Sequence, residues 1–118
     1  MAYHVKDAAE MEPRSGAVRL VRRELGIKSL GVNQYRFPPE WPDYPEHDET
    51  ETNHEELYFV RAGGGTMTVD GDDVELIPGR YVYVSPESKR KILPGPEGLE
   101  YLAVGGPADR EFGGWSDL

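Results

Sequence analysis

Residues 57–84 contain the pattern that most limits the folds open to this chain. Short runs rich in β-branched and aromatic residues follow one another there, separated by glycines, by Asp70-Gly71 and by Pro78-Gly79. The run at residues 66–69 alternates polar and apolar side chains, as a half-buried strand does. Asp70-Gly71 favours a type I′ hairpin, because both central residues of that turn need a positive φ angle. The segment therefore predicts strands at residues 57–60, 66–69, 74–77 and 81–84, with a glycine turn at residues 63–65.

Further strands are predicted on both sides of this segment. Residues 30–37 form a strand that ends at Pro38-Pro39, since proline cannot extend a hydrogen-bonded ladder. Residues 18–22 alternate weakly and are a candidate edge strand. Residues 89–93 are extended as far as Pro94, and the nearly continuous apolar run at residues 99–104 predicts a central strand. Residues 40–45 are interpreted as a rigid surface loop in which Trp41 and Tyr44 pack locally.

These strands and turns predict an all-β protein with a single domain. Its expected architecture is an antiparallel β-sandwich closed into a jelly-roll barrel. A chain of 118 residues can bury one core but cannot hold a second fold. We expect an N-terminal extension at residues 1–16, a barrel domain at residues 17–108 and a polar tail at residues 109–118, with Phe112 and Trp115 as its anchors.

The composition restricts the partners of this chain. It has 13 basic and 22 acidic residues, for a net charge of −9, which disfavours binding to nucleic acid and to anionic membranes. It has no cysteine, so disulfides and thiol chemistry are excluded. The N-terminus has no apolar signal segment, and a cytoplasmic location is expected.

The strand that contains Leu57 presents two different faces. Alternation places Glu56, Tyr58 and Val60 on one side, and Leu57 and Phe59 on the other. Both faces carry apolar side chains, so both are expected to be covered. The outer pair is predicted to contact a second sheet or a second subunit, and a homodimer is the expected assembly.

The same segment resembles the two-part signature of the cupin superfamily. The resemblance rests on Glu56 followed after six residues by Gly63, on Asp70-Gly71, and on Pro78-Gly79 followed by an apolar strand and Pro86. It covers roughly residues 30–105. It implies a cupin barrel with a site in its interior.

Metal-binding cupins present three histidines and a glutamate, and the resemblance carries this pattern over only in part. Glu56 falls on the family glutamate and His47 on the first histidine. Glu49 takes the second histidine position, although the gap between Glu49 and Glu56 is longer than usual; the usual gap points to Glu51 or Thr52. Arg90 occupies the third histidine position. An arginine has no lone pair for a metal ion, so the family's metal centre is incomplete.

His54 offers a way to restore a metal site. It lies two residues before Glu56 and shares its face if the strand begins early. His47, Glu49, His54 and Glu56 would then bind one divalent transition metal ion, namely Zn, Mn, Fe or Ni. Alternatively, Arg90 pairs with Glu56 in a metal-free pocket and anchors an anionic ligand. A third alternative is that His54 belongs to a solvated loop without a site.

The leading interpretation is a cupin-type small-molecule-binding protein with a polar pocket and a degenerate metal site. The expected pocket residues are His47, Glu49, His54, Glu56, Tyr58 and Arg90. One alternative is a metal-dependent enzyme, an oxygenase or isomerase that acts on a small metabolite. Another is a ligand sensor or assembly module that acts through its dimer surface. No catalytic residue is assigned from the sequence.

Overall fold

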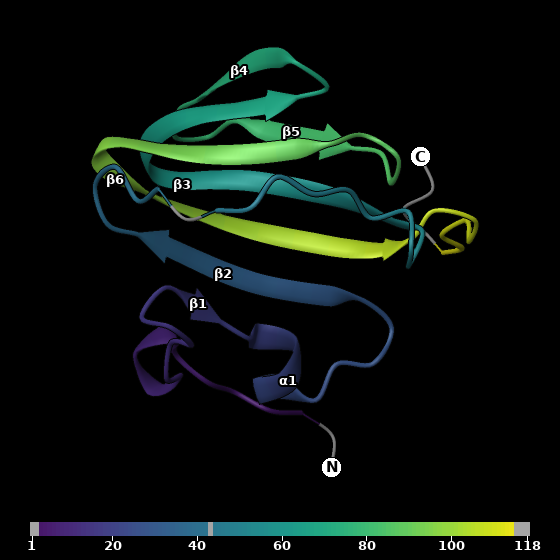
Figure 1. Ribbon diagram of the computed structural model, residues 1–118. Helices are drawn as coiled ribbons and strands as arrows, with labels where there is room; N and C mark the ends of the chain where they lie inside the picture. Colours follow the sequence, from purple (N-terminus) through teal and green to yellow (C-terminus); the bar gives the residue numbers. More distant parts are fainter. Residues whose placement is uncertain (1–2, 43, 115–118) are drawn as a thin grey trace.

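The fold is described by a computed structural model that covers residues 3–42 and 44–114 (Figure 1). It consists of antiparallel strands with very little helix, which confirms the predicted all-β class. The elements in chain order are the 3₁₀-helix η1 (Ala8–Glu10), β1 (Val18–Arg19), α1 (Val21–Leu25), β2 (Gly31–Phe37), β3 (His54–Val69), β4 (Asp72–Leu76), β5 (Tyr81–Val84) and β6 (Arg90–Pro107).

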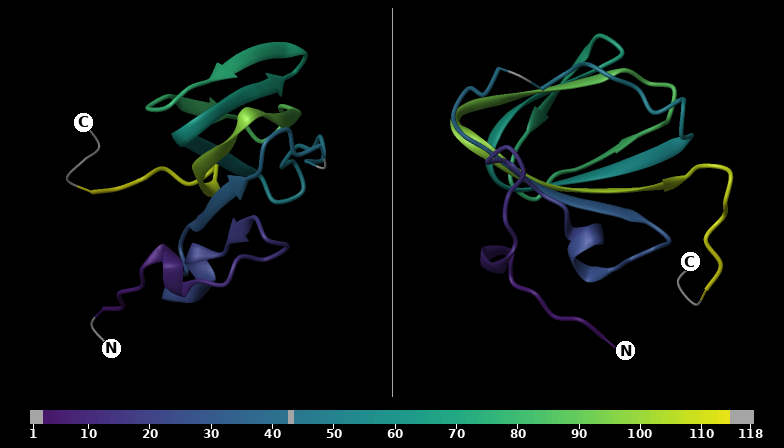
Figure 2. Two further views of the ribbon diagram at one scale, coloured as in Figure 1. Left: turned by 90° about the vertical axis from the view of Figure 1, so that its left-hand side faces the viewer. Right: turned by 60° about the horizontal axis from the view of Figure 1, so that its bottom comes forward.

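All strands belong to one sheet, which curls around the core. The strand order is β1-β2-β6-β3-β4, and β5 pairs with β3 beside β4. The first half of β3 lies between β5 and β6, whereas its second half lies between β4 and β6. Each of the two long strands, β3 and β6, thus forms part of two opposite walls of the barrel. The sheet closes around an interior in the manner of a jelly-roll barrel (Figure 2).

The bend of β3 corrects the prediction of a turn at residues 63–65. The strand runs through this segment, and the register against β6 shifts between Val60 and Ala62 and again between Gly63 and Gly65. Gly63 has a φ of 76°, and a Cβ atom there would overlap the carbonyl oxygen of Gly98. The glycines therefore form bulges that bend one continuous strand.

The same pairing explains why Pro94 does not end a strand. The strands at residues 89–93 and 99–104 were expected to be separate, but residues 90–93 and 99–104 both belong to β6. Proline is tolerated where β6 bends, because the register is already interrupted opposite it at Gly65. The central position expected for residues 99–104 is confirmed, since β6 lies between β2 and β3.

Two predictions near the chain ends have different outcomes. The candidate strand at residues 18–22 is wrong beyond Arg19, because Val21–Leu25 form the short helix α1, which ends at Gly26 with a φ of 72°. In the tail, Phe112 is exposed and anchors nothing, whereas Trp115 lies outside the described residues. Within the described residues, no helix is both long and apolar enough to cross a membrane.

The interior side of the sheet carries the core, and the type I′ turn is confirmed. The largest completely buried apolar side chains are Tyr101, Met67, Leu76, Ile92, Val60 and Val84. At the β3–β4 turn, Asp70 and Gly71 have φ angles of 50° and 86°, as the dipeptide predicted.

The outer side of the sheet carries a second apolar area. Leu57 is 39% exposed, and Phe59 packs against Tyr81 with ring centroids 4.6 Å apart. Cross-strand pairing places Leu57 between Tyr83 and Val104, and Phe59 between Tyr81 and Leu102. No second sheet covers these rows in the described part of the chain.

Candidate functional site

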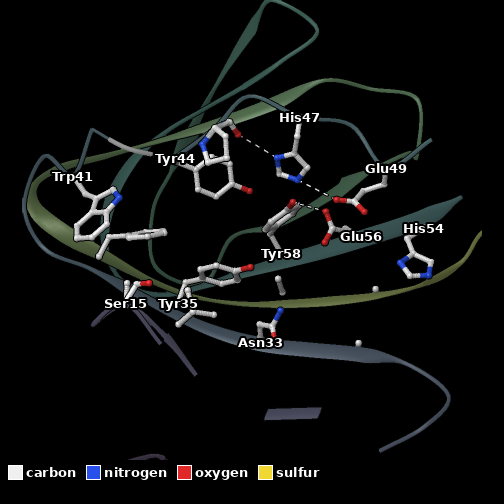
Figure 3. A pocket seen from close by; sticks show the side chains of 17 residues that line it. Ser15, Asn33, Tyr35, Trp41, Tyr44, His47, Glu49, His54, Glu56 and Tyr58 are labelled. Atoms are coloured by element: carbon white, nitrogen blue, oxygen red, sulfur yellow. Dashed lines mark hydrogen bonds and ion pairs between the residues drawn. The ribbon is translucent and has the colours of Figure 1, made fainter. Parts of the chain in front are cut away.

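One end of the barrel opens into a cavity of about 570 Å³ (Figure 3). One wall is aromatic, and the opposite side carries imidazole and carboxylate groups. Glu56 and Tyr58 project into it from β3, Asn33 and Tyr35 from β2, and Ala103 and Gly105 from β6. Further lining comes from Ser15, Ala17, Val18, Gly31, Phe37, Trp41, Tyr44, Pro45, His47, Glu49 and His54.

The register of the three central strands fixes the floor of this cavity. Tyr58 pairs with Ala103, which pairs with Asn33. One row further toward the open end, Glu56 pairs with Gly105, which pairs with Gly31. Glu56 thus lies between Gly105 of β6 and Val84 of β5, and the two glycines of its row place no side chain beside its carboxylate on β6 or β2.

His47 and Glu49 reach the same place from the loop between β2 and β3. The backbone of His47 exchanges two hydrogen bonds with Arg90 of β6, at 3.0 and 2.9 Å. The Glu49 amide donates to the Pro86 carbonyl at 2.8 Å. Asp48, between them, accepts hydrogen bonds from the amide and hydroxyl of Thr50, which hold the pKa of its carboxyl below the usual range. These contacts hold the loop across the mouth of the barrel.

Three of the predicted ligands converge. Ligand atoms of His47, Glu49 and Glu56 all lie within 4.8 Å of one another. The His47 Nε2 atom is 3.1 Å from a Glu49 carboxylate oxygen, and its Nδ1 atom is 3.2 Å from the Pro45 carbonyl. A carbonyl can only accept, so Nδ1 carries a proton. Nε2 then faces the Glu49 carboxylate, so that both groups could bind the same cation.

His54 does not join this group. It lines the cavity from the start of β3, on the same face as Glu56, as alternation predicted. It lies one row further out, opposite Pro107, and it is not part of the convergent set. Three of the four residues suggested by the sequence thus converge, and His54 stands apart because it lies one row beyond Glu56 on β3.

Glu56 is held by two other side chains. The Tyr58 hydroxyl donates to Glu56 Oε1 at 2.7 Å, and Arg90 Nη2 lies 3.8 Å from the same oxygen. The latter distance is that of an ion pair and exceeds that of a hydrogen bond. Arg90 also donates to the Ser85 carbonyl at 3.2 Å. The bidentate Arg90–Glu56 pair considered from the sequence is therefore not formed.

Arg90 lies behind the cavity and is absent from its lining. Its side chain is completely buried, and within the described chain its Nε and Nη1 atoms have no hydrogen-bond partner. A buried guanidinium that no ligand can touch cannot anchor an anion directly. It acts on the site through its positive charge, which faces Glu56.

The aromatic wall keeps several hydroxyl groups in their neutral form. Tyr35 stacks on Tyr101 with ring centroids 4.7 Å apart, and Phe37 contacts Trp41 and Tyr44. Burial raises the pKa of Tyr35, Tyr44 and Tyr58, so these phenols are uncharged at neutral pH and can donate hydrogen bonds.

Sequence reasoning missed the contribution of β2. Alternation over residues 31–37 places Gly31, Asn33, Tyr35 and Phe37 on one face, and this face lines the cavity. The alternation was available in the sequence, but β2 carries no cluster of ligand-type residues that marks it as part of a site. Trp41 and Tyr44, interpreted as local packing in a surface loop, also line the cavity.

Comparison with known proteins gives similarity at the level of structure. No known sequence-family profile matches the chain, and no curated protein matches it. Among solved structures, a cupin protein from Bacteroides fragilis shares 22% identity over 100% of this chain and 96% of its own, with a TM-score of 0.76.

Two other similar structures have functional descriptions. One is described as a sugar phosphate isomerase of the cupin superfamily from Silicibacter pomeroyi; it shares 15% identity over 89% of this chain and 76% of its own, with a TM-score of 0.71. The other, a predicted oxalate decarboxylase from Thermotoga maritima, shares 21% identity over 88% of this chain and 99% of its own, with a TM-score of 0.68. At these identities the likeness concerns the fold, and together with the sheet described above it shows that this chain has the cupin fold.

Proposed function

We propose that this protein binds a small molecule in the barrel cavity, next to one divalent transition metal ion held by His47, Glu49 and Glu56. The observation that carries the proposal is the convergence of these three side chains within 4.8 Å at the end of an aromatic-walled cavity. A volume of about 570 Å³ is in the range of small-molecule sites.

The donor set fits such an ion. One imidazole and two carboxylates are typical ligands for Zn, Mn or Fe, and Ni also accepts an imidazole. The Pro45 carbonyl fixes the His47 tautomer that leaves Nε2 available, as a backbone carbonyl does behind many metal-bound histidines. The His47 Nε2 atom and a Glu49 carboxylate oxygen lie 3.1 Å apart, and a cation bound by both would offset the repulsion between their lone pairs. When bound, the ion would act as a Lewis acid toward a ligand oxygen.

The remaining residues would bind and orient the ligand. Tyr35 and Tyr44 offer neutral hydroxyl donors, Asn33 offers both donor and acceptor groups, and Trp41 and Phe37 offer apolar faces. The set suits a polar ring or chain with hydroxyl groups. Arg90 offsets part of the negative charge of Glu56 from behind the wall.

Metal content and affinity test the site directly. We expect protein purified without an affinity tag to hold close to one equivalent of a transition metal by elemental analysis. In calorimetric titrations, His47→Ala and Glu56→Gln should abolish binding, whereas His54→Ala should leave it unchanged. His54 is the matched control because it lines the same cavity outside the convergent set. Metal-free protein that also fails to bind added Zn²⁺, Mn²⁺, Fe²⁺ or Ni²⁺ contradicts the metal site.

Ligand binding can be followed through Trp41 in the cavity wall. The chain has two tryptophans, so a Trp115→Phe background leaves Trp41 as the only indole. We expect ligands found in a metabolite screen to change the Trp41 emission, and Tyr35→Ala to weaken them. A ligand that binds equally well to Tyr35→Ala does not occupy this cavity.

A metal-dependent enzyme is the second candidate function. The specific observation in its favour is the Tyr58–Glu56 hydrogen bond of 2.7 Å, which places a proton donor and a carboxylate side by side in the cavity. Such a pair can move a proton to and from a bound substrate. Turnover that is lost in Tyr58→Phe while metal and ligand binding persist would favour the enzyme over the binding protein.

A homodimer through the outer face of the sheet is part of the proposal. The face has two cross-strand rows, Tyr83–Leu57–Val104 and Tyr81–Phe59–Leu102. Tyr81 and Tyr83 are 66% and 61% exposed, which is costly for a side chain of this size in a monomer. A second copy would cover both rows at once, and any sensing or assembly role would act through this surface.

A further inference from the structure

A second cavity adjoins the first at the open end of the barrel. Its volume is about 430 Å³, and it shares Gly31, His54 and Gly105 with the first cavity. Its charged and titratable lining consists of Arg22, Lys28, His54 and Arg110. We call these four residues the basic mouth.

The basic mouth contrasts with the rest of the chain. The protein has a net charge of −9, yet no carboxylate lines this cavity. Arg22, Lys28 and Arg110 form no ion pair with a carboxylate elsewhere in residues 3–42 and 44–114. Glu24, the neighbouring acidic residue on α1, accepts a hydrogen bond from Lys6. Three cations therefore remain available to an anion from solution.

The fold brings these residues together from distant parts of the sequence. Arg22 lies on α1, Lys28 in the connection to β2, His54 at the start of β3 and Arg110 just after β6. The pairing of Gly31 with Gly105 and of His54 with Pro107 places the start of β2, the start of β3 and the end of β6 at one edge. Figure 1 shows β2 beginning on the side where β6 ends.

Two of the three residues that line both cavities, Gly31 and Gly105, have no side chain. Glu56 lies on the same row as Gly105 and Gly31, and a Cβ atom on Gly105 would lie 3.5 Å from Glu56 Cγ. The first cavity is acidic around Glu49 and Glu56, whereas the adjoining one is basic. A ligand that spans both would meet carboxylates or a bound cation at one end and cations at the other.

We propose that the basic mouth binds the phosphate group of a small organic phosphate monoester whose uncharged part lies in the first cavity. This inference rests on the proposed function, because the first cavity must accept the remainder of the ligand. A phosphate monoester carries close to two negative charges at neutral pH and three acceptor oxygens. Arginine and lysine side chains bind such a group through charge-assisted hydrogen bonds.

Phosphate binding is tested with defined probes in EDTA, so that the metal site plays no part. Inorganic phosphate, ribose 5-phosphate and ribose are titrated into ¹⁵N-labelled protein, and amide shifts are followed by NMR. We expect both phosphates to shift amides of residues 28–31, 105–106 and 110, and ribose 5-phosphate also those of residues 33 and 56–58. Ribose should bind far more weakly. Absence of shifts at the basic mouth overturns the inference.

Charge variants test whether phosphate binds at the basic mouth or is attracted to any positive charge on the protein. Lys28→Gln/Arg110→Gln should weaken the binding of both phosphates by at least about tenfold, since it removes two of the three cations that would donate charge-assisted hydrogen bonds. Arg23→Gln is the control, because Arg23 is exposed on the same helix but does not line the cavity. Equal weakening in the control, or malonate binding more tightly than phosphate, would refute a phosphate site here.

A steric variant tests whether the ligand spans both cavities. Gly31 has no positive φ, and a Cβ there would meet only the Gly105 carbonyl, at 3.7 Å, so Gly31→Val should fold. We expect Gly31→Val to weaken ribose 5-phosphate much more than inorganic phosphate. Equal effects on both probes overturn the spanning ligand. Native protein that binds phosphate but no added metal ion would contradict the proposed metal site alone.

Discussion

The Nη2 atom of Arg90 lies 3.8 Å from Glu56 Oε1, and Arg90 is the largest of the described side chains that the protein buries completely. Its charge is poorly compensated, because Nε and Nη1 have no partner within the described residues. Glu56 faces the cavity and remains partly solvated, with 20% of its side chain exposed. The pair therefore joins a buried cation to an accessible anion, and its two members should respond differently to substitution.

Removing Glu56 should destabilise the protein more than removing Arg90. Glu56→Gln leaves a buried guanidinium without its counter-ion, and we expect the free energy of unfolding to fall by about 2–3 kcal/mol. Arg90→Met removes the buried charge and keeps most of the volume, so we expect a change of less than about 1 kcal/mol. Urea denaturation in EDTA measures both, and the double variant should be more stable than Glu56→Gln. If the double variant is instead the least stable, Arg90 has a stabilising role of its own.

Arg90→His should increase metal affinity. The substitution replaces a group that cannot bind a metal by an imidazole that shares the buried position beside Glu56. We expect Ni²⁺ or Zn²⁺ to bind at least about tenfold more tightly by calorimetry, since one more imidazole would join the ligand set. Arg90→Gln is the control for loss of charge. Unchanged affinity in Arg90→His would indicate that the side chain at this position does not reach the convergent ligands.

Glu100 should contribute stability that disappears in acid. On the outer face it accepts hydrogen bonds from Arg61 and Gln34, and the Arg61 guanidinium holds its pKa below the usual carboxyl range. A carboxyl whose pKa is lowered by folding stabilises the protein above its unfolded-state pKa, and this contribution falls as pH drops through the folded-state pKa.

The comparison of Glu100→Gln with the native protein tests this dependence. Because Arg61 is 64% exposed, we expect a loss of only about 1 kcal/mol at pH 7. The difference in unfolding free energy should shrink as the pH is lowered from 5 toward 2. Asp73→Asn is the control, because Asp73 is exposed and forms no ion pair within the described residues. A gap between Glu100→Gln and the native protein that stays constant with pH would count against the pairing.

Gly63→Ala should be far more disruptive than Gly71→Ala. Both glycines have positive φ angles, 76° and 86°, so both variants lose about 1 kcal/mol to backbone strain. A Cβ at Gly71 meets nothing within 4 Å, whereas one at Gly63 overlaps the Gly98 backbone where β3 and β6 bend together. Thermal unfolding should show a modest shift for Gly71→Ala and partial or complete loss of folding for Gly63→Ala. Equal shifts would mean that the bend adjusts freely.

Light scattering should report a dimer that Leu57→Asp converts to monomer. A charge in the middle of the outer apolar rows would have to be buried without a partner at the interface. Ile77→Asp is the matched control, because Ile77 has the same exposed fraction of 39% and lies outside those rows. A native protein that is monodisperse and monomeric at high concentration would contradict the dimer.

The local features of this protein could be predicted from its sequence. The Asp70-Gly71 turn depends on the φ preferences of two adjacent residues, and the shared face of Glu56 and Tyr58 depends only on strand alternation. The all-β class follows from the same signals summed along the chain.

Features that depend on the partner strand were decided by the tertiary structure. Three glycines can form a turn or a pair of bulges, and the pairing of β3 with β6 on both sides of Gly63–Gly65 selects the bulges. The buried position of Arg90, the separation of His54 from the metal ligands, and the meeting of Arg22, Lys28 and Arg110 also follow from strand register. The hydrogen bonds between strands fix the register, and the register decides which side chains become neighbours. It therefore depends on residues that are far apart in sequence.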